Sequence, residues 1–215
     1  MTHHIPFPAG APAHSLDHWL SPELARVSPP NAPSRLRQLA DAQGTRAAGW
    51  SSAITGGPVL ALAGAFFSTM SGDPAAVLVL APLGVALMLL GISSWKRVRA
   101  TLPNTNRILI SRGPGSGRGG IAMVSVLAVA LGCILSLYLP SALVKGDGTA
   151  ATLVGSFVLI LALLVACIVV PSTVMGRARD SFRQRVQSNP ELRRAVEQDL
   201  AVWRDPHGNA GYGPL

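Results

Sequence analysis

Four long stretches of this sequence contain no Asp, Glu, Lys, Arg or His, and this constrains the fold more than any other feature. They cover residues 47–72, 74–95, 119–144 and 148–176, and are 26, 22, 26 and 29 residues long. About 20 mostly apolar residues in an α-helix cross a hydrocarbon core about 30 Å thick. The sequence therefore predicts an all-α integral membrane protein with four transmembrane helices.

The positive charges predict which side of the membrane the ends of these helices face. Seventeen of the eighteen Lys and Arg residues precede the first stretch, separate the second from the third, or follow the fourth, and only Lys145 lies elsewhere. Basic residues near span ends are retained in the cytoplasm, and Trp residues such as Trp50 and Trp95 mark membrane interfaces. We therefore expect two transmembrane hairpins with both termini in the cytoplasm. Because the first 45 residues contain no apolar run, we expect no cleavable signal peptide.

The same pattern divides the chain into five regions. Residues 1–45 form a proline-rich cytoplasmic arm, 46–95 the first hairpin, 96–118 a basic cytoplasmic loop, 119–176 the second hairpin and 177–215 a helical cytoplasmic region. The Ala-, Gly-, Pro- and Arg-rich composition indicates a GC-rich bacterial gene, and hence a bacterial inner membrane. The outer loops of the hairpins share a Gly-Asp pair at an offset of 74 residues. This offset fits either a duplicated two-helix unit or the likeness that hydropathy alone produces.

The N-terminal arm contains start signals for two helices. Ser21 can cap a helix that has Pro22 at its first position, and Ser34 can cap a second helix that continues through Leu36 and Leu39 towards the first span. The arm is too short, and too often interrupted by proline, to build an independent core.

The C-terminal region predicts an amphipathic helix that begins with Asn189 as its cap and Pro190 at its first position. Its apolar stripe consists of Leu192, Val196, Leu200 and Trp203. Residues 190–205 carry a net charge of −1, which argues against an anionic-membrane anchor and favours protein contact. The stripe packs either on the chain's own cytoplasmic face or on a partner, and we expect the glycine-rich residues after Pro206 to be mobile unless bound.

The net charge of +8 raises the question of a nucleic-acid partner. Insertion topology already accounts for nearly every positive charge, and no nucleic-acid motif is present, so we expect no nucleic-acid binding. Basic residues beside a span can attract anionic lipid headgroups, or they can serve only to fix the topology. The headgroup candidates are Lys96, Arg97, Arg99, Arg177 and Arg179.

The absence of ionisable residues from the four stretches removes the usual carriers of proton relays and ion-coupled transport. Pro58 and Pro82 could still free backbone carbonyls to bind an ion, so a transport function stays open as a less favoured alternative. The two cysteines, Cys133 and Cys167, lie within the stretches and are most simply small apolar fillers.

No residue pattern in this sequence predicts a catalytic, metal or cofactor site. All five His residues lie in the terminal arms, so no span offers a His base or a haem ligand. His14 and His18 have the spacing of one helical face, but exposed His in a mobile arm is the simpler interpretation. Residues 115–120 match the glycine spacing of a dinucleotide fingerprint, yet a membrane span follows, so we expect a linker there, or at most a weak nest for a lipid phosphate.

Small residues recur every four positions within the spans, a spacing that lets helices approach closely. The strips consist of Ala53, Gly57, Ala61 and Ala65, then Ala128, Gly132 and Ser136, and finally Ala151 and Gly155. They serve either internal packing of the four helices or an intermolecular seam.

These observations favour a non-enzymatic, polytopic bacterial inner-membrane protein that acts through protein–protein contacts. It would serve as an accessory or assembly subunit, or as a regulator, of a larger membrane complex. Its expected partners are the lipid bilayer and a membrane protein or a second copy of the chain. The alternative is a small transporter or channel, possibly dimeric, without charged residues in its spans.

Overall fold

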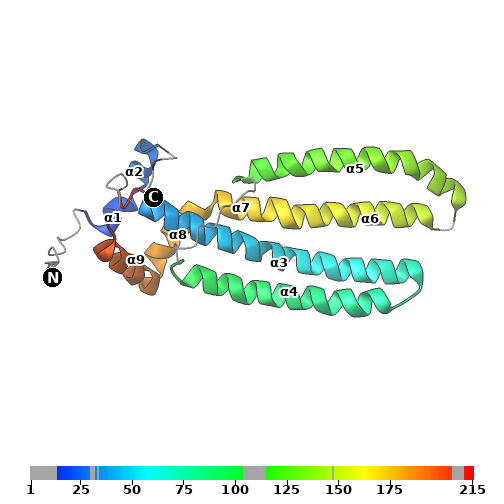
Figure 1. Cartoon of the computed structure of the whole chain (residues 1–215), viewed down its shortest axis with the longest axis horizontal. Coiled ribbons are helices and arrows are strands. Elements are labelled where there is room, and N and C mark those ends of the chain that lie inside the picture. The colour runs from blue at the N-terminus through cyan, green and yellow to red at the C-terminus, as the bar shows by residue number, and fades with distance from the viewer. Residues whose placement is uncertain (1–13, 30–31, 33, 104–114, 147, 205–210) are drawn as a thin grey trace, which may run out of the picture. The chain divides into compact units, whose positions relative to one another are not determined.

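The computed structural model of this chain describes residues 14–29, 32, 34–103, 115–146, 148–204 and 211–215. Secondary structure in these ranges is helical, apart from one isolated parallel bridge between Ser34 and Gly211. The elements are α1 (Leu16–Trp19), α2 (Pro22–Val27), α3 (Arg35–Ser71), α4 (Ala75–Ala100), α5 (Gly117–Lys145), α6 (Thr149–Leu164), η1 (Val165–Val169), α7 (Val170–Gly176), α8 (Ala178–Ser188) and α9 (Pro190–Val202) (Figure 1).

The four stretches predicted from the sequence form four helices that are long and apolar enough to cross a membrane. They are α3, α4, α5 and the continuous run α6–η1–α7, which covers Thr149–Gly176. Their most apolar 18-residue windows have mean hydropathies of 1.4, 2.6, 2.5 and 3.2. The chain is thus built as a multi-pass membrane protein.

The chain divides into two compact units. The described parts of residues 1–43, 100–108 and 178–215 form one, which we name the terminal unit. Residues 44–99 and the described part of 109–177 form the other, which we name the span unit. The spans of the span unit lie in the order α5, α6–α7, α3 and α4 in Figure 1, each beside the next.

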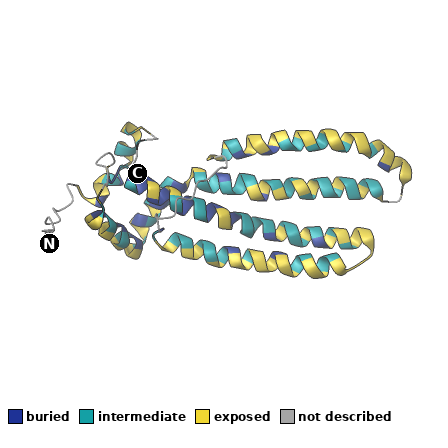
Figure 2. Ribbon diagram, viewed as in Figure 1, coloured by how far each residue is buried: buried dark blue, intermediate teal, exposed yellow. Residues whose placement is uncertain are grey.

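The span unit buries almost no large side chain. Among its described residues, every buried position except Val124 is Gly, Ala or Ser, and Figure 2 shows few buried positions along the spans. The buried set is Gly44, Ala47, Ala48, Ser51, Gly57, Gly64, Gly84, Gly91, Gly120, Val124, Ala142, Ala166 and Ser172. Lipid tails are as apolar as Leu, so close backbone packing must replace the hydrophobic effect between spans.

Helices α3 and α4 meet through two glycines whose backbones touch. A Cβ on Gly57 would overlap the Gly84 carbonyl oxygen, and a Cβ on Gly84 would overlap the Gly57 carbonyl oxygen. Further along the same seam, a Cβ on Gly64 would lie 2.9 Å from the Leu80 Cβ, and a Cβ on Gly91 would lie 2.9 Å from the Ile54 Cγ1. These four glycines define the α3–α4 seam.

The first predicted small-residue strip lies largely on this seam. The Cβ of Ala53 lies 3.2 Å from the position of a Cβ on Gly91, and the Cβ of Ala61 lies 3.3 Å from that of one on Gly84. Ala65 is exposed, and Gly64 takes the contacting position instead. The spacing of the contacting positions in α3 therefore changes from four residues to three after Ala61.

The other strips are placed differently. Gly155 of α6 receives the ring of Phe66 from α3, which leaves no room for a side chain there. In α5, Ala128 and Gly132 are half-buried and Ser136 is exposed, and a Cβ on Gly132 would meet no atom within 4 Å. Helix α5 instead approaches the fourth span near its own start, where Gly120 faces Ser172.

The α3–α4 seam gives a sharp prediction, because Gly56 and Gly57 are neighbours with opposite surroundings. Gly57→Ala drives a methyl group into a backbone carbonyl that cannot move aside, so we expect a loss of about 1–3 kcal/mol in the free energy of unfolding. The methyl group added by Gly56→Ala points into open space. We therefore expect no loss in the free energy of unfolding, and a gain of at most about 1 kcal/mol. Unfolding by sodium dodecyl sulfate in mixed micelles measures both, and equal effects would contradict the seam.

Candidate functional site

The terminal unit has an apolar core assembled from parts of the chain that are far apart in sequence. The buried core residues are Leu16, Leu20, Leu36, Leu39, Ala40, Phe182, Val186, Leu192, Val196, Leu200, Tyr212 and Leu215, with Trp19, Leu102 and Trp203 packed against them. Residues before the first span, after the second and after the fourth all contribute. The side-chain amide of Gln43 adds a hydrogen bond, donating to the Thr101 carbonyl at 2.9 Å.

The stripe of α9 lies in this core. Leu192, Val196 and Leu200 are 1%, 0% and 9% exposed, and Trp203 packs at the edge of the same cluster. The stripe thus covers the chain's own core, which is the first of the two arrangements considered from the sequence. In this arrangement the side chains of Leu192, Val196 and Leu200 pack inside the chain's own core.

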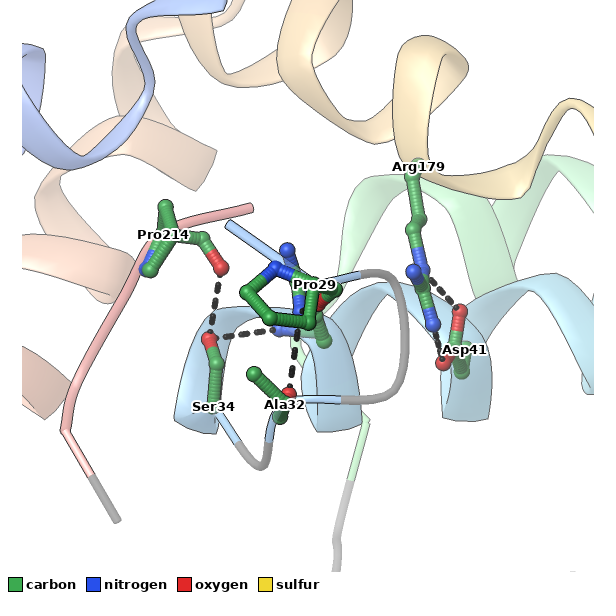
Figure 3. Close-up of polar contacts among 7 residues, drawn as sticks. Pro29, Ala32, Ser34, Asp41, Arg179 and Pro214 are labelled. Carbon is green, nitrogen blue, oxygen red and sulfur yellow. Dashed lines mark hydrogen bonds and ion pairs between the residues drawn. The ribbon is translucent and has the colours of Figure 1, made fainter. Parts of the chain in front are cut away.

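A short extended segment, Gly211–Leu215, closes one side of the core, and we name it the strap. Carbonyls of the strap accept hydrogen bonds from the first turn of α3. The Leu36 N–H donates to the Tyr212 carbonyl at 2.8 Å, and the Arg35 N–H donates to the Gly211 carbonyl at 3.3 Å. These N–H groups have no partner within their own helix. The hydroxyl of Ser34 donates to the Pro214 carbonyl at 2.8 Å (Figure 3). The strap therefore caps α3.

The side chain of Tyr212 anchors the strap. Its hydroxyl donates to the Val196 carbonyl at 2.9 Å, and its ring packs edge-on against Trp203 at a centroid distance of 5.9 Å. Burial raises the pKa of Tyr212 well above its usual range, so the hydroxyl stays a neutral donor. The residues after Pro206 were expected to be mobile unless bound, and Gly211–Leu215 are bound to the chain itself.

Two bidentate guanidinium–carboxylate pairs link helices on the outside of this unit. Arg35 contacts Asp199 of α9 with nitrogen–oxygen distances of 3.1 and 2.8 Å, and the side chains are 16% and 20% exposed. Arg179 of α8 contacts Asp41 of α3 at 3.0 and 2.8 Å (Figure 3), with 38% and 50% exposed. Hydrogen bonding to these carboxylates raises the pKa of both arginines. Such two-point pairs fix the orientation as well as the contact.

The predicted headgroup residues are divided between the two units. Lys96, Arg97 and Arg99 lie in the last turns of α4, and Arg177 follows α7, so the antiparallel spans bring them to one end of the span unit (Figure 1). The guanidinium of Arg99 lies 4.2 Å from the centre of the Trp95 ring, within cation–π range. Arg179 belongs to the terminal unit, where it is paired with Asp41.

The fourth span contains a helix irregularity that hydropathy did not reveal. The helix takes the π form at Val165–Val169, just before Pro171, which has no N–H to donate to the preceding turn. In the π register the carbonyl left without a backbone donor is that of Ala166. The Thr55 hydroxyl of α3 lies 3.2 Å from this carbonyl and 2.9 Å from that of Ser51 in its own helix.

The remaining candidate positions are the histidines and the glycine-rich residues 115–120. His14 and His18 stack with ring centroids 4.3 Å apart, while His3, His4 and His207 lie outside the described residues. Among the described residues, no group of three or more His, Cys, Asp or Glu side chains could hold a metal ion. Ser116 caps α5 by accepting from the Gly119 N–H at 3.3 Å, so the second half of the glycine-rich motif begins a helix.

No family model matches this sequence, and neither does any curated protein or solved structure.

Sequence reasoning missed three features of these sites. The strap carries one signal that could have revealed it, namely a lone Tyr among glycines near an apolar Leu. Pro171 follows the irregular segment of the fourth span, but Pro58, Pro82 and Pro140 lie within regular α-helix, so proline alone does not reveal the irregularity. Gly64 was not predicted as a packing residue, because the four-residue spacing from Gly57 leads to Ala65.

The Arg35–Asp199 pair predicts a measurable coupling energy. We expect a double-mutant cycle of Arg35→Gln and Asp199→Asn to give about 1 kcal/mol, because the pair is bidentate and mostly shielded. The same cycle on Arg179 and Asp41, a more exposed pair of similar geometry, should give a smaller coupling. Chemical unfolding of the four variants in detergent measures both couplings, and a zero coupling at Arg35 would contradict the arrangement.

The Thr55 contact predicts a loss on Thr55→Val, which keeps the shape of the side chain and removes the hydroxyl. We expect a destabilisation of about 0.6 kcal/mol and at most about 1.7 kcal/mol, the range for hydrogen bonds between spans. Thr69→Val is the matched control, because that hydroxyl is exposed and bonds only to Phe66 in its own helix. Unfolding in mixed micelles measures the difference, and equal stabilities would argue against the contact with Ala166.

Proposed function

We propose that this chain is a non-enzymatic, polytopic protein of a bacterial inner membrane that acts through protein–protein contacts. It serves as an accessory or assembly subunit, or as a regulator, of a larger membrane complex. The observation that carries this proposal is how little of each span is buried within the chain. Only 6–11% of the residues in the most apolar window of each span are buried in the chain, so most span residues keep exposed or half-exposed side chains for contacts with lipid and other proteins.

The outward faces of α4 and α5 support this proposal. Leu78, Val126 and Leu137 are 70%, 70% and 77% exposed. The strip at Ala128, Gly132 and Ser136 lies on α5 with open space over Gly132, as a seam for a helix of another protein or of a second copy would require. Internal packing uses other residues of α5, such as Gly120 and Val124.

The proposed topology places both termini and the basic end of the span unit in the cytoplasm. Support comes from the antiparallel spans, which gather Lys96, Arg97, Arg99 and Arg177 at one end and leave Lys145 at the other (Figure 1). At the cytoplasmic end these side chains also attract anionic headgroups, each with about 1 kcal/mol near the surface.

Cysteine labelling tests this topology. In a chain with Cys133→Ser and Cys167→Ser, we expect a cysteine at Ser71, the last residue of α3, to react with a membrane-impermeant maleimide in intact spheroplasts. A cysteine at Ser188, the last residue of α8, should react only after lysis. The reverse pattern would overturn the orientation.

Purification from native membranes tests the proposed mode of action. We expect a stoichiometric membrane-protein partner, or a second copy, to accompany the chain in mild detergent. Gly132→Leu should reduce this recovery severalfold without lowering the unfolding temperature, because the new side chain enters open space. Val129→Leu, at a position 68% exposed on the same helix, is the control. An isolated monomer that binds nothing would contradict the proposal.

The alternative, a small transporter or channel, is favoured by one observation, the π segment in the fourth span. Irregular backbone at membrane depth is a recurring feature of transporter sites, and here the Ala166 carbonyl faces a hydroxyl of another span. Solute flux into proteoliposomes that contain the purified chain, and its loss in Pro171→Ala, would favour this alternative over the first.

A further inference from the structure

The strap is held mainly through its main chain. Carbonyls of Gly211, Tyr212, Pro214 and Leu215 all accept hydrogen bonds, and the Leu215 N–H donates to the Trp19 carbonyl at 3.2 Å. Recognition of an extended segment through main-chain groups supplies affinity that does not depend on most of its side chains. Any extended peptide could satisfy the same donors.

Two positions of the strap supply the selectivity. Tyr212 is 6% exposed, and its hydroxyl donates a hydrogen bond to the Val196 carbonyl. The groove that the strap fills therefore contains a slot for an aromatic ring with a hydroxyl. Gly213 packs closely against Trp19: a Cβ on Gly213 would lie 2.8 Å from an atom of the Trp19 ring. The groove therefore accepts a tyrosine followed by a glycine, and it excludes most other pairs.

We propose that this groove is a peptide-binding site and that the strap occupies it as an internal competitor. The residues that line it are Trp19, Ser34, Leu36, Arg183, Val196 and Trp203. Its external ligand is an extended segment of a partner protein with a Tyr-Gly pair and a following apolar residue. This inference rests on the proposed function, in which the chain acts through protein contacts, and it names the recognition chemistry of one contact.

Exchange of the strap for a partner segment follows from the groups that the strap covers. An empty groove would leave the Arg35 and Leu36 N–H groups and the buried Ser34 hydroxyl without their acceptors, which is costly. The groove is therefore stable only when filled. A segment tethered within the same chain competes at an effective concentration on the order of millimolar, so the external peptide binds the intact chain weakly unless the strap is weakened.

A fluorescent peptide with the sequence of residues 211–215, Gly-Tyr-Gly-Pro-Leu, tests this proposal by anisotropy on the full chain in lipid nanodiscs. We expect Tyr212→Ala and Gly213→Ala, each of which weakens the strap, to bind the peptide about tenfold or more tighter than the unmodified chain, because the competent fraction rises. Tyr138→Ala removes the other tyrosine, 60% exposed on α5, and should match the unmodified chain. A peptide with Ala in place of Tyr should bind none of them.

Stability measurements make each result decisive. If the variants unfold at a lower temperature, added peptide should restore that temperature towards the unmodified value. Absence of saturable binding to both variants overturns the proposal, and so does loss of helical content that the peptide fails to restore, because the strap would then be an inseparable part of the fold. The assay uses no natural partner, so its outcome is independent of whether a partner co-purifies.

Discussion

The contact between the backbones of Gly57 and Gly84 is the constraint on which the arrangement of the spans depends. In a bilayer, lipid covers a leucine as well as a neighbouring helix does, so two spans associate only where close packing offers more than lipid contact. The glycines of the α3–α4 seam remove the side chains that would separate the two helices. The seam thereby frees the large apolar side chains of both helices to face outward.

The terminal unit follows a different rule, because its apolar residues are buried in the usual way. Leu36, Phe182 and Val196 are fully buried, while arginine–carboxylate pairs lie on the outside. Its core needs contributions from three separated parts of the chain, and the strap completes it by accepting the first N–H groups of α3. The first N–H groups of α3, which lack acceptors within the helix, thus donate to the strap.

Much of this fold could be predicted from the sequence, because charge and proline mark where helices begin and end. The uncharged stretches gave the four spans, and Ser21 and Pro22 begin α2 as expected. The strap could not be predicted, since its five residues carry no periodicity and bind through their main chain. Which strip of small residues packs internally also escaped prediction, because Gly57 and Gly132 have similar neighbours in sequence, and only the three-dimensional arrangement separates them.

Solid-state NMR of the protein in lipid bilayers can detect the contact between the glycine backbones of α3 and α4. With ¹³C at the glycine carbonyl and Cα positions, we expect a through-space correlation between the Gly57 carbonyl and the Gly84 Cα. A spectrum that shows the sequential Gly56–Gly57 correlation and lacks the Gly57–Gly84 correlation would rule this contact out.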